Sequence, residues 1–156
     1  GHGLSVTGGR FSLALAVAAA LAVPAAAQPA QPTAKALYLL KCSGCHRADG
    51  QGAVQAGVPP FPGFVGALAS DPAGRTYMLH VPGVMGSGLG NPDLARVMNY
   101  LLDTWSAVPA DRIPRFTSQE VERLRAVPVN DVVNYRRGVV ARLRKSGAPV
   151  AEYPWP

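Results

Sequence analysis

The segment that most constrains this chain is CSGCH, residues 42–46. It contains both cysteines of the 156-residue sequence, and a histidine directly follows the second one. The printed sequence offers no third cysteine with which either thiol could form a disulfide elsewhere. Any fold must therefore bring two thiols and one imidazole together within a single turn.

The spacing C-x-x-C-H is typical of covalent c-type haem attachment. Each thiol adds to one vinyl group of the porphyrin and forms a thioether, and the turn brings the imidazole of His46 beneath the iron. The other imidazole nitrogen needs a hydrogen-bond acceptor that fixes its tautomer. We therefore expect Cys42 and Cys45 to hold one covalent haem c, with His46 as an iron ligand. With both sulfurs in thioethers, the haem rather than a disulfide must hold the core.

Two other uses of paired cysteines fit the sequence less well. A thioredoxin-like dithiol requires a strand–turn–helix setting, which the flanking residues do not predict. A zinc site requires a second pair of ligands, and only His2 and His80 remain for that purpose. Haem attachment is the prediction that uses all three residues of the motif.

The N-terminal residues have the pattern of a secretory signal peptide. Arg10 precedes an apolar run over residues 11–23, and small residues follow up to Ala27. An uncleaved membrane anchor is the alternative, but the run is short for a spanning helix and Pro24 follows it. We expect residues 1–27 to be a signal peptide, the protein to be periplasmic, and no membrane span to remain after cleavage.

The charge balance of the remaining residues is moderately basic. Arg10 is the only charged residue among the first 27, so the other 14 Lys+Arg and 9 Asp+Glu give a formal charge of +5. We expect no nucleic-acid partner, because no basic run is flanked by stacking aromatics. The charge suits docking to an acidic surface of a protein partner. Solubility alone is the simpler alternative explanation.

The residues around the motif predict helices and turns. Residues 33–41 predict a short helix that runs into the motif. Residues 47–52, RADGQG, predict a turn in which Gly50 and Gly52 adopt positive φ. Residues 57–66, GVPPFPGFVG, predict an apolar loop with few amide protons to satisfy, because proline has none.

With these neighbours, the sequence resembles the class I mono-haem cytochromes c. The resemblance rests on LY before CSGCH, on HRADGQG after it, and on the proline-containing VPPF of residues 58–61. It implies an all-α fold around one haem. It also implies that the carbonyl of Pro59 accepts a hydrogen bond from His46, with Pro60 as an equal alternative, and that Phe61 packs on the haem edge.

A second helix follows the loop that would supply the other iron ligand. Residues 91–105, NPDLARVMNYLLDTW, predict a helix with Asn91 as N-cap and Pro92 in its first turn. Its apolar stripe comprises Leu94, Val97, Met98, Leu101 and Leu102.

In the family that this chain resembles, a methionine just before that helix binds the iron, and Met85 is in this place. A thioether is a neutral, soft ligand, and Met/His ligation raises the reduction potential. The loop lacks the Met-Pro pair that is common in the family. His80 is an alternative ligand, and an open iron site is another. Met78 and Met98 lie in predicted helices and are expected to be core residues.

The C-terminal third predicts a helical extension. Residues 106–116 form a proline-broken linker, and Thr117 with Glu120 has the spacing of a capping box at the start of a helix over 117–126. A second helix is expected within 127–147, capped by Asn130 or Asp131 and ended by Gly147.

Two uses of this extension are compatible with each other. Its valine stripe favours packing against the haem domain, and its basic residues favour a docking surface for a redox partner. The expected basic outer face comprises Arg136, Arg137, Arg142, Arg144 and Lys145.

The sequence thus predicts an all-α protein in three parts. These are a signal peptide over 1–27, a cytochrome c haem domain over 28–105, and a basic helical extension over 106–156. The expected function is periplasmic one-electron transfer with a dehydrogenase, reductase or oxidase as partner, without bond-making catalysis. The alternatives are a cytochrome subunit of a larger oxidoreductase, or a haem enzyme or sensor with an open iron site.

Overall fold

The computed structural model describes residues 1–4 and 30–152. The predicted signal peptide, residues 1–27, therefore lies almost wholly outside the described residues, as do residues 153–156. The chain divides into two units, Gly1–Ala30 and Gln31–Pro156, and the helices of the described residues lie in the second. None of the helices in the described part of the chain is both long and apolar enough to cross a membrane.

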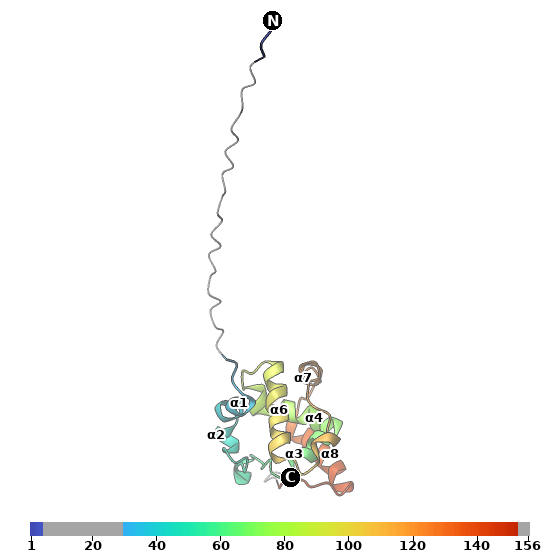
Figure 1. Cartoon of the computed structure of the whole chain (residues 1–156). Coiled ribbons are helices and arrows are strands. Elements are labelled where there is room, and N and C mark those ends of the chain that lie inside the picture. The colour runs from blue at the N-terminus through green and yellow to red at the C-terminus, as the bar shows by residue number, and fades with distance from the viewer. Residues whose placement is uncertain (5–29, 153–156) are drawn as a thin grey trace. The chain divides into compact units, whose positions relative to one another are not determined.

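The described residues form an all-α structure, as predicted (Figure 1). They contain no strand, and a single isolated bridge pairs Ala53 with Val58. The α-helices are α1 (Ala34–Lys41), α2 (Ser43–His46), α3 (Val65–Ser70), α4 (Pro72–His80), α5 (Pro82–Met85), α6 (Asn91–Trp105), α7 (Ser118–Arg125) and α8 (Val132–Lys145). Two 3₁₀ turns, Val54–Ala56 and Ala110–Arg112, lie in the connections.

Side-chain caps begin the two C-terminal helices where the sequence predicts them. The Thr117 hydroxyl accepts a hydrogen bond from the Glu120 amide at 3.1 Å, which caps α7. The Asp131 carboxylate accepts from the Asn134 amide at 2.9 Å, which caps α8 and selects Asp131 over Asn130. Such caps satisfy amides that have no partner within the helix.

The predicted cap of α6 is wrong by one residue. The N-cap is Gly90, which has no side chain, and Asn91 is already helical. The Asn91 side-chain oxygen accepts a hydrogen bond from Arg125 Nη1 at 2.7 Å. The side chain that the sequence predicts as the cap of α6 thus binds a residue of α7 that lies 34 positions away.

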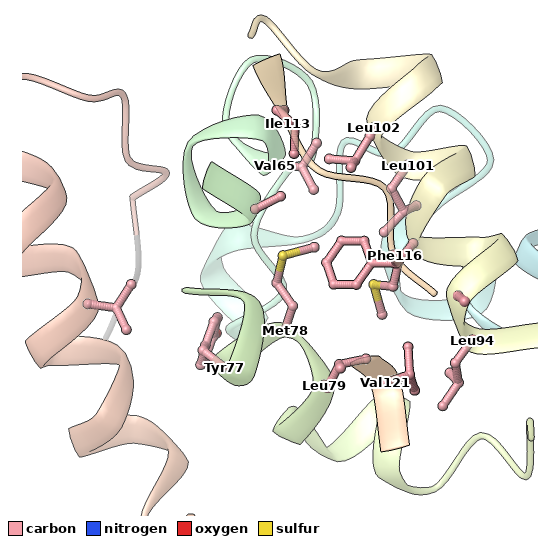
Figure 2. Packing of buried hydrophobic residues seen from close by; sticks show 14 of the residues in the cluster. Val65, Tyr77, Met78, Leu79, Leu94, Leu101, Leu102, Ile113, Phe116 and Val121 are labelled. Carbon is pink, nitrogen blue, oxygen red and sulfur yellow. The ribbon is translucent and has the colours of Figure 1, made fainter. Parts of the chain in front are cut away.

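The helix α6 lies at the centre of the helical unit and buries the predicted apolar stripe. It packs against α1, α3 and α7 (Figure 1). Its five stripe residues, Leu94, Val97, Met98, Leu101 and Leu102, are all buried. Figure 2 shows Leu94, Leu101 and Leu102 in one cluster with Met78 of α4 and Phe116 of the linker.

The C-terminal extension belongs to this same core. Val121 of α7 and Val139 of α8 are almost fully buried, and Ile113 and Phe116 of the linker are buried as well. The Asn99 side chain holds the linker, because its amide group both donates to the Phe116 carbonyl and accepts from the Phe116 amide at 2.9 Å. Packing of the extension against the preceding helices is therefore the arrangement that the structure shows.

An ion pair between a buried arginine and a half-buried glutamate joins α4 to α7. The guanidinium of Arg75 donates to both carboxylate oxygens of Glu120, at 2.7 and 2.6 Å, and to the carbonyl of Ala69 at 3.0 Å. It also lies 3.6 Å from the centre of the Phe116 ring, a cation–π distance. The carboxylate of Glu120 is thus committed to Arg75.

The prediction of a basic outer face on α8 is only partly correct. Arg137, Arg144 and Lys145 are exposed, but Arg136 is buried, because this position of α8 faces the interior. Arg142 reaches from α8 to the carboxylate of Asp71 at 3.1 Å, so its charge serves a contact between helices.

Replacement of Glu120 tests the ion pair that joins α7 to α4. In Glu120→Ala the buried guanidinium of Arg75 loses its carboxylate, and we expect the free energy of unfolding to fall by roughly 3–5 kcal/mol. Urea denaturation of the purified protein, followed by circular dichroism, measures this change. Glu122→Ala, an exposed glutamate two residues away on the same helix, is the matched control and should be nearly neutral. Equal stabilities of the two variants would refute the role of the pair.

Candidate haem-binding site

The helix α1 delivers the motif and fixes the turn that follows it. Tyr38 is fully buried, and its hydroxyl donates to the carbonyl of Arg47 at 2.5 Å. Arg47 has φ of 65°, which is uncommon for a residue other than glycine. Burial, followed by the nearby Cys42, raises the pKa of Tyr38 to about 12, so the hydroxyl remains a donor. A buried tyrosine thus holds the backbone directly after His46.

Aromatic rings support this tyrosine. The Tyr38 ring centre lies 5.1 Å from that of Trp105 and 5.5 Å from that of Tyr100, both on α6. Phe61 of the proline loop is 6.4 Å away in an edge arrangement. Such ring pairs stabilise beyond simple burial, and here they join α1, α6 and the loop next to the motif.

The two glycines after the motif bend the chain back onto the proline loop. Gly50 and Gly52 have φ of 73° and 63°, as predicted. The Gly52 amide donates to the His46 carbonyl at 3.0 Å. A Cβ atom on Gly52 would lie 2.4 Å from the Val58 carbonyl oxygen, so no larger residue fits without movement of the backbone. The turn therefore sets the position of the loop relative to His46.

The imidazole of His46 is half-buried between the motif and this loop. The Phe61 ring stacks on it with centres 4.1 Å apart and planes inclined by 20°. Burial lowers the pKa of His46, although the Pro59 carbonyl acts in the opposite direction. The neutral imidazole, which is the form that binds metals, is thus favoured. The Pro59 carbonyl lies near His46, but the buried Nδ1 atom does not form a well-aligned hydrogen bond with any described residue.

The two cysteines differ in exposure. Cys42 is half-buried, and burial together with the neighbouring Cys45 raises the pKa of its thiol. Cys45 is exposed. One thiol thus faces the interior while the other lies at the surface.

A cavity of about 320 Å³ opens at these three residues. Its wall includes Cys42, Cys45 and His46, and it is otherwise mostly apolar. The loop contributes Val58, Pro59, Pro60 and Phe61, and the helices α4 and α6 contribute Met78, Leu94, Val97, Met98 and Leu101. Its size and character are those of a site for a small apolar cofactor.

These residues fit a covalently bound haem. Two thiols and an imidazole that is favoured in its neutral form lie on one wall of an apolar cavity, and the Pro59 carbonyl is close enough to His46 to act on its pKa. Cys42 and Cys45 would form the thioethers, and His46 would bind the iron. The fold and the site together define an all-α haem protein of the c-type class.

Comparison with known families agrees with this class. The family model of cytochrome c matches residues 32–105, from the start of α1 to the end of α6. A search of curated proteins finds no significant match. Residues 32–105 thus form a cytochrome c domain with one attachment motif, and this family binds haem c covalently and acts in haem-based electron transfer.

The structure separates Met85 from the cavity wall. Met85 ends α5 and is 48% exposed, whereas its neighbours Pro82, Gly83 and Val84 line the cavity. Its role as the second iron ligand stays a prediction. Its alternative, His80, donates from Nδ1 to the Thr76 carbonyl at 2.8 Å and does not line the cavity either.

Two methionines that the sequence assigned to the core do line the cavity. Met78 and Met98 are both buried, on α4 and α6. Figure 2 shows Met78 directed into the same cluster as Phe116. A helical stripe predicts burial but cannot distinguish a wall of packed side chains from the wall of a cofactor cavity.

The sequence also gave no sign that the extension reaches the cavity. Val132, Val133 and Arg136 of α8 line it, together with residues 149–151 of the tail. These residues are far from the motif along the chain, and their proximity depends on how α8 packs on α4.

Removal of both thiols tests the attachment. We expect Cys42→Ala/Cys45→Ala to lose its haem on denaturation, because no thioether would remain. Each single variant should keep the haem through one bond and show a red-shifted haemochrome, since one vinyl stays conjugated. A haem stain of denaturing gels and the pyridine haemochrome spectrum measure these outcomes. Ser43→Ala, between the two cysteines, is the control; haem that remains with the denatured double variant would contradict the assignment.

Replacement of single methionines tests the second ligand. We expect Met85→Leu to lose the far-red absorption band of methionine–iron ligation and to lower the midpoint potential, because the thioether favours ferrous iron. Met78→Leu and Met98→Leu preserve side-chain volume and serve as controls. If Met85→Leu keeps the band and one of those two variants loses it, the second iron ligand is that cavity-wall methionine and not Met85.

Proposed function

We propose that this cytochrome is a periplasmic one-electron carrier. It would accept an electron from a dehydrogenase or reductase complex and deliver it to an oxidase or another acceptor. When bound, haem c supplies the ferric/ferrous couple, and the chain supplies axial ligands, an apolar pocket and a docking surface. The periplasmic location follows from the predicted signal peptide alone.

The observation that carries the proposal is the contrast between the exposed Cys45 and the apolar cavity behind it. A carrier needs one cofactor edge close to the surface and the remainder in a dry environment. Cys45 and the half-buried loop residues Pro59 and Pro60 would form this edge. Apolar surroundings and limited solvent access also tune the potential.

The surface near this edge suits transient association. Leu40 of α1 is 73% exposed two residues before Cys42, and Leu39 is exposed next to it. Lys41 adds a positive charge between them and the motif, in agreement with the net charge of +5 outside residues 1–27. An acidic partner surface would be attracted over a distance, and the contact itself would be small and apolar.

A second candidate function has its own support. Because Met85 lies off the cavity wall, the iron could keep an open position, as in a haem enzyme or a sensor of a diatomic gas. The third possibility, a cytochrome subunit of a larger oxidoreductase, would use the exposed arginines of α8 as part of its interface. Sizing chromatography of the purified protein distinguishes this from a freely diffusing monomer.

Absorption spectroscopy with carbon monoxide distinguishes the carrier from the open-site alternative. For a carrier we expect low-spin spectra in both oxidation states, and the reduced spectrum should not change when carbon monoxide is added, since both axial positions are filled. A high-spin spectrum that shifts with carbon monoxide would refute the carrier assignment and favour the enzyme or sensor. A haem protein with two axial protein ligands and one with an open iron position serve as the closed and open references.

A further inference from the structure

The cavity wall extends beyond the cytochrome c domain. The matched domain ends at residue 105, yet Val132, Val133 and Arg136 of α8 line the cavity, as do residues 149–151 of the tail. The C-terminal extension therefore completes the haem pocket in addition to packing on the core. Among the cavity-lining residues that it supplies, Arg136 is the one with a charge.

Arg136 is held inside the protein. The residue is 8% exposed, and its Nη2 donates to the carbonyl of Ala151 at 3.2 Å. This contact ties the tail to α8. Burial of a guanidinium is costly unless negative or hydrogen-bonding groups surround it. Its neighbour Arg137 is exposed, so α8 presents one arginine to the cavity and the next to solvent.

The position of Arg136 matches one particular edge of a haem. The two vinyl groups that Cys42 and Cys45 bind lie at one edge of the porphyrin, and the two propionate carboxylates lie at the opposite edge. Figure 1 shows α2, which carries Cys45, and α8 on opposite sides of the helical unit. The cavity spans from the one to the other. The other cation on its wall, Lys41, is next to Cys42 and thus belongs to the vinyl edge.

We propose that Arg136 binds a haem propionate and that the C-terminal extension thereby sets the reduction potential of this cytochrome. The fork of a guanidinium matches a carboxylate with two parallel hydrogen bonds, a geometry that an ammonium group cannot reproduce. The buried positive charge favours ferrous over ferric iron, since the ferric site carries one more positive charge. The proposal rests on the covalent haem and is independent of whether the protein is a free carrier.

Spectroelectrochemical titration across about pH 5–9 provides the test. In Arg136→Ala we expect a lower midpoint potential than in the wild type, and a pH-dependent segment of the potential that moves to higher pH, because the propionate loses the cation that keeps it ionised. Arg136→Lys should restore most of the potential, since the charge remains. Arg137→Ala, one residue along α8, should resemble the wild type.

Other ionisable groups near this wall must be separated from the propionate. On the cavity wall these are Lys41, Cys42, Cys45, His46 and Tyr77, and on the elements around α8 they are Asp71, Arg75, His80 and the tail residue Glu152. Tyr77→Phe and Glu152→Gln are therefore titrated in the same way. Each should retain the pH profile of the wild type.

A second readout addresses a purely structural role. Resonance Raman spectra of the reduced protein report the bending bands of the propionates, which should shift in both Arg136→Ala and Arg136→Lys because the bidentate contact is lost. If Arg136→Ala does not fold, Arg136→Lys still carries this test. Unshifted bands together with a wild-type pH profile would overturn the proposal, even if stability falls. The proposal would also be overturned if the pH-dependent segment of the potential moved in Glu152→Gln and not in Arg136→Ala.

Discussion

The central constraint on this structure is that its helices converge on a cavity that a haem must fill. Protein interiors are close-packed, so a cavity of about 320 Å³ is far larger than ordinary packing defects. A cofactor that fills this mostly apolar cavity removes its apolar wall from water and restores the contacts of a close-packed interior. Covalent attachment at Cys42 and Cys45 makes this contribution permanent. The chain has no disulfide, and the haem takes over that role as well.

The C-terminal extension shows how one segment can serve both the core and the cofactor. Its linker and helix α7 are fixed by Asn99 and by the pair of Arg75 with Glu120, whereas α8 is fixed by its valines and by Arg142 at Asp71. These contacts hold α8 against α4, and α4 lines the cavity. A substitution in the extension therefore alters the haem pocket. In this way the extension can adjust the reduction potential of a small protein.

Much of the fold could be predicted because the signals were local. The helix over 33–41, the caps Thr117 and Asp131, the glycine turn and the apolar stripe of α6 each depend on a few neighbouring residues, and the structure confirms them. The errors arose where distant residues compete for the same group. Asn91 binds Arg125 instead of capping α6, and Arg136 is buried although the next residue, Arg137, is exposed. Periodicity alone could not place Met78 and Met98 on a cavity wall.

The sequence by itself determined the chemistry of attachment, because the two thiols and the imidazole act within five consecutive residues and need no distant partner. It also determined the helical character of the chain, since caps, glycines and apolar spacing are short-range properties. Only the tertiary structure decided what surrounds the cofactor: the methionines on its wall, the exposure of Met85, and the arginine that reaches it from residue 136. Those positions depend on how α4, α6 and α8 pack, and such packing is a property of side chains brought together from distant parts of the chain.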